Sequence, residues 1–243
     1  MWYFLEEGFW YDPWLIALFV VSVSLIVFLR YVLFAWVYQV TLRALRKETP
    51  DIFKVREGQI RTEIRYAFQS SCVFTAMAAA TLFAWHMGWT NLYSRMDEYP
   101  LWYYLLSGVI IVLGYETYYY WLHRWMHQPR VFKHIHKVHH RSIQPTVFTS
   151  FSFHPLEALL QFAYFPVILI VVPVHYSMLL AVLTLFTISA LINHSGQEIY
   201  GNANVRRHII GAGHHEVHHK SFHHNYGLFF TWWDQWMGTN RDP

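Results

Sequence analysis

The sequence predicts an all-α integral membrane protein with about four to five transmembrane or re-entrant helices and a helical, histidine-rich cap on the cytoplasmic side. Hydrophobic residues make up 55% of the 243 residues and charged residues only 14%, whereas a soluble domain carries about 25% charged residues. The length suits one domain, so we expect residues 1–243 to form a single membrane-embedded unit. The one cysteine, Cys72, excludes a disulfide framework and a cysteine-based zinc or iron–sulfur site.

Four apolar stretches are long enough to cross a bilayer core, which needs about 20 residues. They cover residues 14–37, 66–87, 101–122 and 156–193. The fourth stretch is too long for one span, and Pro173 divides it into two segments of roughly span length. We therefore expect a hairpin of two helices there, either crossing fully or re-entering. Arg30, near the end of the first stretch, is able to extend its side chain toward the headgroups.

The distribution of basic residues predicts the orientation of these spans. Residues 1–13 contain no Lys or Arg, and the loop 88–100 contains only Arg95. The connector 41–65, in contrast, contains Arg43, Arg46, Lys47, Lys54, Arg56, Arg61 and Arg65. The segment after the third span is also basic, with Arg124, Arg130, Lys133, Lys137 and Arg141. Both histidine-bearing regions, 123–154 and 194–224, are therefore expected on the cytoplasmic side.

These two regions contain three histidine motifs. The motif HRWMH places His123 and His127 four residues apart, so both side chains can reach one metal from one face of a helix. The motifs HKVHH and HEVHH each place three histidines at positions i, i+3 and i+4; these are His136, His139 and His140, and His215, His218 and His219. Adjacent histidines on a helix point about 100° apart, so one can join the first histidine at a metal while the other turns elsewhere. Two triplets and a pair suit a two-metal centre.

The ligand type narrows the choice of metal only in part, because imidazole binds zinc, copper, iron and nickel. A structural zinc site closes with four ligands and has no use for eight or more histidines. So many neutral nitrogen donors favour a redox or oxygen-handling centre, with iron as the leading choice. The alternatives are a metal transporter and a non-catalytic membrane scaffold. A transporter would distribute its ligands through the spans, whereas these motifs lie just beyond the span ends.

Two carboxylates are candidates for a supporting role beside the metals. Glu116 lies in the third span, two helical turns before His123 and on the same face. An intramembrane carboxylate usually has a partner, and a metal-bound histidine commonly donates its other N–H to a carboxylate. The alternative for Glu116 is a hydrogen bond in helix packing. Asp234, in WWDQWMGT, is the second candidate. The alternative for Asp234 is a role in helix capping or packing. His223 and His224 follow a different spacing, which favours a structural or substrate-facing role.

Five motifs resemble, in this order, the sterol desaturase/fatty acid hydroxylase superfamily of integral-membrane, non-haem di-iron oxidoreductases. They are YYWLHRWMHQPRVFKHIHKVHH, HPLEALL, NHSG, GHHEVHH and NYGLFFTWWDQWMGT. The resemblance covers roughly residues 101–240, the expected catalytic region. Within the superfamily, NHSG followed by HHEVHH most resembles the C-4 sterol methyl oxidase and cholesterol 25-hydroxylase branch.

The resemblance implies a set of iron ligands. It includes the three motifs and the histidine of NHSG: His123, His127, His136, His139, His140, His194, His215, His218 and His219. Some fatty acid hydroxylases carry another histidine four residues after the counterpart of His194, and here that position is Glu198. The tenth ligand is therefore either His214 or Glu198. If Glu198 is not a ligand, we expect it to support the ligands from beside the metal centre.

The resemblance also implies cofactors, partners and a location. We expect two iron ions, O2 as co-substrate and a lipid, such as a sterol, that is hydroxylated, desaturated or oxidised. The sequence has no CxxC motif and no Gly-rich dinucleotide fingerprint, so electrons from NAD(P)H are expected to arrive through a separate cytochrome b5 or ferredoxin with its reductase. No nucleic acid partner is expected. The membrane would be the endoplasmic reticulum in a eukaryote and the inner membrane in a bacterium.

Overall fold

The computed structural model describes residues 7–45 and 57–242. Four basic residues that entered the orientation argument, Arg46, Lys47, Lys54 and Arg56, lie outside the described residues. The elements in chain order are α1 (Glu7–Tyr11), α2 (Pro13–Leu45), α3 (Gln59–His86), β1 (Leu92–Tyr93), α4 (Leu101–Met126), α5 (Pro129–Phe132), the 3-10 helices η3 (His139–Arg141) and η4 (Val147–Phe151), α6 (Pro155–Phe162), α7 (Tyr164–Val171), β2 (Val174–His175), α8 (Tyr176–Asn193), α9 (Ala203–Arg206), α10 (Ala212–Ser221) and α11 (Trp232–Trp236). The predicted all-α class is confirmed, since the two short strands pair only with each other.

Three of the described helices are long and apolar enough to cross a membrane: residues Pro13–Leu42 of α2, the whole of α3 and the whole of α8. The chain is therefore an integral membrane protein. Helix α4 is as long as α3 to within two residues, but it is not among these three helices. The fourth predicted stretch is divided as expected: α6 and α7 form the shorter apolar arm (Pro155–Val171), and α8 begins after the break at Pro173.

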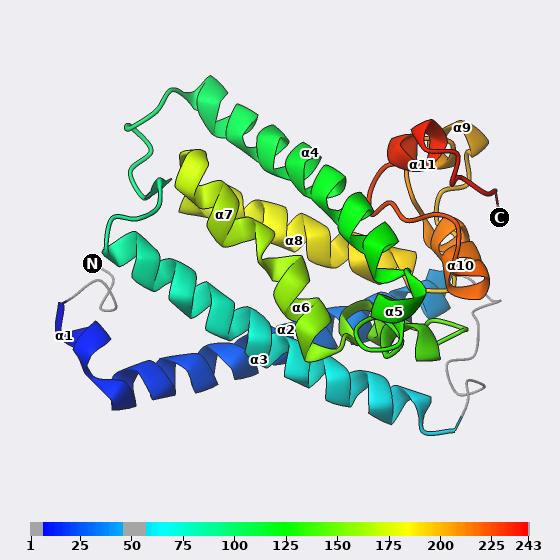
Figure 1. Cartoon of the computed structure of the whole chain (residues 1–243), viewed down its shortest axis with the longest axis horizontal. Coiled ribbons are helices and arrows are strands. Elements are labelled where there is room, and N and C mark those ends of the chain that lie inside the picture. Colours follow the sequence, from blue (N-terminus) through cyan, green and yellow to red (C-terminus); the bar gives the residue numbers. More distant parts are fainter. Residues whose placement is uncertain (1–6, 46–56, 243) are drawn as a thin grey trace.

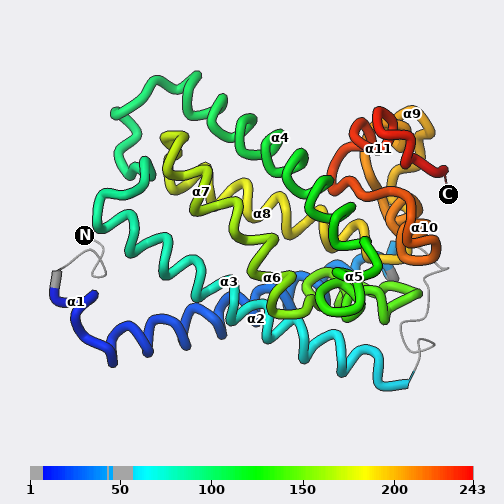
Figure 2. Tube along the Cα trace, in the orientation of Figure 1, coloured from blue at the N-terminus to red at the C-terminus, as the bar shows by residue number. Residues whose placement is uncertain are grey.

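The long helices lie lengthwise, and the short helices α5, α9, α10 and α11 gather at one end of the molecule, opposite the end that carries α1 (Figure 1). Helices α2 and α3 run side by side in opposite directions, and α8 lies between them and α4, as the trace in Figure 2 also shows. Both α2 and α8 run toward the end that carries α5, α9, α10 and α11. That end, named the cap below, collects residues 123–154 and 194–242, although these regions are far apart in sequence.

Two apolar clusters hold the helices together. The larger joins α4, α7 and α8 around Tyr115, whose ring stacks on Phe165 at 5.3 Å and on Phe186 at 4.6 Å. The smaller joins α2, α3, η4 and α8 around Tyr31. The Tyr31 ring stacks on Phe151 at 4.8 Å, and its hydroxyl donates to the Phe148 carbonyl at 2.7 Å. Buried aromatic pairs of this kind contribute both area and specific ring geometry.

A buried carboxylate on α3 fixes the loop that follows η3. The carboxylate of Glu63 accepts hydrogen bonds from the hydroxyls of Ser142 (2.7 Å), Thr146 (2.6 Å) and Thr149 (2.9 Å). The side-chain amide of Gln59 adds a fourth hydrogen bond at 2.8 Å. A buried charge needs several such donors to replace the water it has lost. Since η3 contains two of the predicted ligands, this network couples α3 to the position of the second histidine motif.

We expect Glu63→Ala to destabilise the protein by a few kcal/mol, because three buried hydroxyls and an amide would lose their acceptor. For a chain of this size, that loss lowers the melting temperature by roughly 5 °C or more. Thermal unfolding in detergent would measure the change, with Glu57→Ala as the control because Glu57 is exposed next to the start of the same helix. Equal melting temperatures for the two variants would contradict this account of Glu63.

Candidate metal centre

Nine buried histidines of the cap form two groups. The His123 group contains His123, His127, His136, His140 and His218, and the His194 group contains His139, His194, His215 and His219. Within each group, one ring nitrogen from every member lies within 4.8 Å of those of the others. Nine of the ten histidines named from the sequence are therefore brought together, in two separate clusters.

The division between the groups follows from local helix geometry. In the motif HKVHH, His136 and His140 point into the His123 group and His139 into the His194 group. In HEVHH on α10 the pattern is reversed: His218 joins the His123 group, and His215 and His219 join the other. Residues i and i+4 share a helix face, and the residue between them points away. Each triplet therefore bridges both groups.

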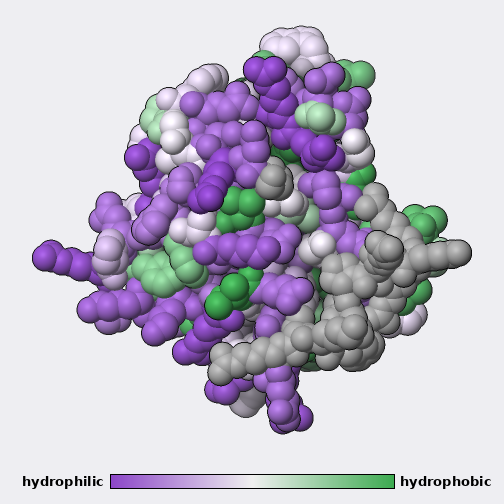
Figure 3. Space-filling model, turned by 90° about the vertical axis from the view of Figure 1, so that its right-hand side faces the viewer, coloured by the Kyte–Doolittle hydropathy of each residue, from purple (hydrophilic) through white to green (hydrophobic). Residues whose placement is uncertain are grey.

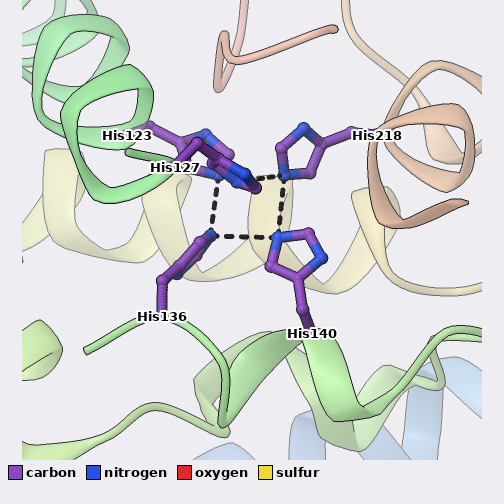
Figure 4. A group of neighbouring side chains, drawn as sticks. All are labelled: His123, His127, His136, His140 and His218. Carbon is purple, nitrogen blue, oxygen red and sulfur yellow. Dashed lines mark hydrogen bonds between the residues drawn. The ribbon is translucent and has the colours of Figure 1, made fainter. Parts of the chain in front are cut away.

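Within each group the Nε2 atoms face one another. Figure 4 shows the His123 group, in which the Nε2 atom of His136 lies 3.0 Å from those of His123 and His140. The Nε2 atom of His218 lies 3.0 Å from that of His140 and 3.1 Å from that of His127. In the other group, the Nε2 atom of His194 lies 3.2 Å from that of His139 and 3.0 Å from that of His215.

The opposite ring nitrogens of several histidines are held by oxygen acceptors. The Nδ1 atom of His123 lies 2.9 Å from the Tyr226 carbonyl, and that of His218 lies 2.7 Å from the His224 carbonyl. The Nδ1 atom of His194 lies 2.7 Å from the Ala190 carbonyl. A carbonyl only accepts, so these Nδ1 atoms carry the hydrogen, and a neutral imidazole then presents a lone pair at Nε2.

These facing lone pairs show that the donor set fits a metal ion. Two nitrogen lone pairs about 3 Å apart repel each other, and a cation between them turns that repulsion into ligation. Neutral imidazole is also the form in which histidine binds a metal. Both groups therefore have the chemistry of a metal site, built from nitrogen donors alone.

Burial keeps these rings neutral. Loss of water around the charged form lowers the pKa of His123 and His194 to about 4 and that of His127 to about 2. For His127, repulsion from neighbouring histidines adds to the effect. Burial lowers the pKa of the remaining six well below the usual value for histidine; these are His136, His139, His140, His215, His218 and His219.

Glu157 is a functional candidate that the sequence interpretation did not select. Its carboxylate accepts a hydrogen bond from Nδ1 of His136 at 2.8 Å, and both side chains are buried. Gln161 donates to the same oxygen at 3.1 Å. A carboxylate in this position fixes the ring and makes Nε2 a stronger ligand. The available signal was the motif HPLE, in which a carboxylate opens an apolar helix.

Glu116 and Asp234 support the centre through backbone groups rather than through a histidine ring. Glu116 accepts hydrogen bonds from the backbone N–H groups of residues 228, 229 and 230, at 3.1, 2.9 and 3.3 Å. Asp234 accepts from the N–H groups of Tyr226 (2.8 Å) and Gly227 (2.9 Å). Glu116 therefore binds backbone N–H groups instead of the expected histidine ring, because residues 228–230 lie against this part of α4. Both carboxylates hold the segment whose Tyr226 carbonyl orients His123.

Neither candidate for a tenth ligand reaches the two groups. His214 points away from them on α10, and its Nε2 atom lies 3.3 Å from Oδ1 of Asn240. Glu198 accepts the backbone N–H of Gly213 at 3.1 Å, in the first turn of α10, where a negative charge is favourable. A Cβ atom at Gly211 would lie 2.5 Å from this carboxylate, so the close approach requires glycine. Both residues thus help to position α10.

The chain is similar in sequence to one known protein family and to several of its members. The family model for fatty acid hydroxylase matches residues 108–239. Over 230 residues the chain is 31% identical to the Delta(7)-sterol 5(6)-desaturase erg3A of Aspergillus fumigatus, covering 89% of this chain and 63% of that protein. It is 32% identical to ERG3A of Gibberella zeae, named a Delta(7)-sterol 5(6)-desaturase, over 77% of this chain and 53% of that protein. Human lathosterol oxidase is 29% identical, over 77% of this chain and 63% of that protein.

The chain thus spans about half to two thirds of the length of these relatives. No solved structure matches it. The relatives named above are sterol 5(6)-desaturases and a lathosterol oxidase, so the finer resemblance to C-4 sterol methyl oxidases and cholesterol 25-hydroxylases stays a prediction. The family model covers more than half of the chain and includes every member of the two histidine groups. The chain belongs to the sterol desaturase/fatty acid hydroxylase superfamily.

Proposed function

We propose that the protein is a membrane-bound, O2-dependent oxidoreductase that hydroxylates or desaturates a C–H bond of a sterol or another lipid. The observation that carries the proposal is the pair of inward-facing, neutral histidine groups at one end of a bundle of apolar helices. The names of the relatives, sterol desaturases and a lathosterol oxidase, support a lipid substrate. In this proposal residues 1–243 form one membrane-embedded domain, with the site in residues 101–240.

The nine grouped histidines would hold two iron ions, one in each group. Iron bound there would supply the reduction of O2 and the oxidation of an unactivated C–H bond. The protein itself orients the histidine rings and excludes water from the site. The carbonyls of Tyr226, His224 and Ala190 and the carboxylate of Glu157 fix four rings, and burial of all nine rings keeps bulk water from the centre.

A cavity gives an apolar substrate access to the His194 group. It has a volume of about 360 Å³, lies among α2, α3, α4 and α8, and includes His194 in its lining. Phenylalanine and aliphatic side chains dominate the rest of the lining. Its surface is therefore suited to hydrocarbon, and only one of the two histidine groups faces it.

The electrons would reach the cap from a separate donor, such as a cytochrome b5 or a ferredoxin with its reductase, ultimately from NAD(P)H. The outer face of the cap is mostly hydrophilic (Figure 3), and Arg124, Arg130 and Lys133 are exposed there. An acidic redox protein would be attracted to such a surface. The excess of basic residues also supports a cytoplasmic cap, facing the cytosol from the endoplasmic reticulum in a eukaryote or from the inner membrane in a bacterium.

The alternative of a metal transporter finds no support in the geometry. Ligands for transported ions would be spaced along the membrane spans, whereas the nine histidines gather in the cap. The compact pair of groups instead suits metals that stay bound.

The proposed function predicts an oxidised lipid. Cells that express the wild-type chain should accumulate a lipid that has gained one oxygen or lost two hydrogens, and cells that express His139→Ala should not, because the His194 group would lack a ligand. Untargeted lipid mass spectrometry with and without O2 measures this. Identical lipid profiles for wild type and variant, in cells that contain sterols and fatty acyl lipids, would refute the proposal.

Loss of one histidine from either group should remove metal from that group. We expect the purified wild-type protein to contain about two iron ions per chain, and both His139→Ala and His140→Ala to contain about one, because the two residues belong to different groups. Elemental analysis measures the iron content. His208→Ala is the control, since His208 is exposed and outside both groups; full iron occupancy in both test variants would contradict the ligand assignment.

Replacing Glu157 should weaken metal binding without removing a ligand. In Glu157→Gln the charged acceptor of His136 is lost, and losses of this kind reduce metal affinity by about 10- to 100-fold. Iron release can be followed against increasing chelator concentration. Glu216→Gln, on the exposed side of α10 where Glu216 pairs with Lys220, should behave as wild type. An iron-release curve for Glu157→Gln that matches this control would contradict a role of Glu157 in metal binding.

A further inference from the structure

One charged side chain lines the cavity that reaches His194. Among the described lining residues, Arg30 of α2 is the one that is charged at neutral pH. Its Nε atom is buried without a hydrogen-bond partner among the described residues, and no described acidic residue forms an ion pair with it. Its Cζ atom lies 5.9 Å from the centre of the Phe34 ring. A guanidinium in apolar surroundings is costly unless an oxygen acceptor satisfies it.

Several other polar side chains of the cavity wall already have hydrogen-bond partners, whereas the hydroxyls of Tyr115 and Tyr119 have none among the described residues. The hydroxyl of Thr75 donates to the Ser71 carbonyl at 2.9 Å, and that of Thr187 donates to the Leu183 carbonyl at 2.9 Å. Gln161 donates to Glu157. Arg30 is thus the charged lining residue whose hydrogen-bond donors have no partner among the described residues.

The faces of two helices shape this cavity along its length. On α2 the lining residues are Val23, Ile26, Val27 and Arg30, spaced as one helix face. On α8 the lining extends from Leu180 to His194, about 21 Å along the helix axis. Ile26 and Leu180 are 63% and 58% exposed, so the cavity opens between these helices on the surface that the bilayer covers.

Arg30 lies at the end of the cavity nearest the histidines. The next residue, Tyr31, stacks on Phe151 at 4.8 Å. Phe153, two residues further on, has its ring 5.1 Å from that of His139. Because α2 and α8 both run toward the cap, the stretch from Val23 to Arg30 approaches the His194 group, and Arg30 is its last lining residue.

We propose that Arg30 binds the oxygen-bearing end of the lipid substrate. The guanidinium would donate hydrogen bonds to that oxygen and place carbon atoms a few bonds away beside the His194 group, with the rest of the hydrocarbon extending between α2 and α8 toward the bilayer centre. A sterol suits this polarity, because its hydroxyl group lies at one end of a rigid apolar ring system. The inference rests on the proposed function for the identity of the reacting carbon, while the binding role stands on the cavity itself.

Equilibrium binding to the full-length protein in phosphatidylcholine nanodiscs tests the role of Arg30 without turnover. The probes are two matched pairs: cholestanol and 5α-cholestane, and hexadecanoic acid and hexadecane. Wild type should prefer the oxygen-bearing member of at least one pair by about tenfold, the effect of one hydrogen bond to a charged group. The pair that shows the preference identifies a hydroxyl or a carboxylate as the oxygen bound.

In Arg30→Met the ratio of the two dissociation constants within a pair should fall close to one. In Arg95→Met, whose substitution lies in an exposed loop, the ratio should stay as in wild type. If Arg30→Met does not fold, Arg30→Gln, with fewer donors and no charge, should show a reduced preference. An unchanged preference in the folded Arg30 variant, or no preference in wild type, would overturn the inference. The protein could also prefer the oxygen-bearing probe through Arg30 and yet oxidise no lipid. That result would contradict only the proposed function.

Discussion

The cap depends on holding neutral imidazoles with their Nε2 lone pairs turned toward each other. Such an arrangement is repulsive without a cation, so the fold must supply the constraint from behind the rings. It does so with acceptor oxygens at Nδ1: backbone carbonyls for His123, His218 and His194, and a carboxylate for His136. Burial contributes as well, because it lowers the pKa of these histidines and prevents protonation from relieving the repulsion.

Buried carboxylates then fix the segments that carry those acceptors. Glu116 and Asp234 bind consecutive backbone N–H groups of residues 226–230, and Glu63 binds the hydroxyl groups of the loop after η3. None of these three carboxylates accepts a hydrogen bond from a histidine ring of the described residues. Three of the 15 acidic residues of this sparsely charged chain therefore hold segments around the centre in place.

The features that sequence could predict are those set by local geometry. The apolar stretches and Pro173 predicted the long helices and the break before α8, and the i, i+3, i+4 spacing predicted that adjacent histidines would turn in different directions. The division of each triplet between two groups is a direct result of that spacing. The match of nine histidines to the groups also relied on motif resemblance for His194, which has no spacing relation to the others.

Tertiary contacts explain what sequence reasoning missed. Glu116 shares a helix face with His123, yet residues 228–230 pack against it and take its hydrogen bonds. Glu157 meets His136 although the two are 21 positions apart, a proximity that no periodicity reports. His214 is adjacent to a grouped histidine, but its direction on α10 leads to Asn240. In each case the partner was decided by how distant segments meet in the cap.

The contribution of α10 to both histidine groups has a consequence for how the protein is assembled. His218 completes one group, and His215 and His219 complete the other, so neither group exists until this late segment has been synthesised and has docked against α4, η3 and the end of α8. Under the proposed function, both groups could bind their metals only after translation has passed residue 219 and α10 has docked, so metal loading would be among the last steps in the maturation of the protein.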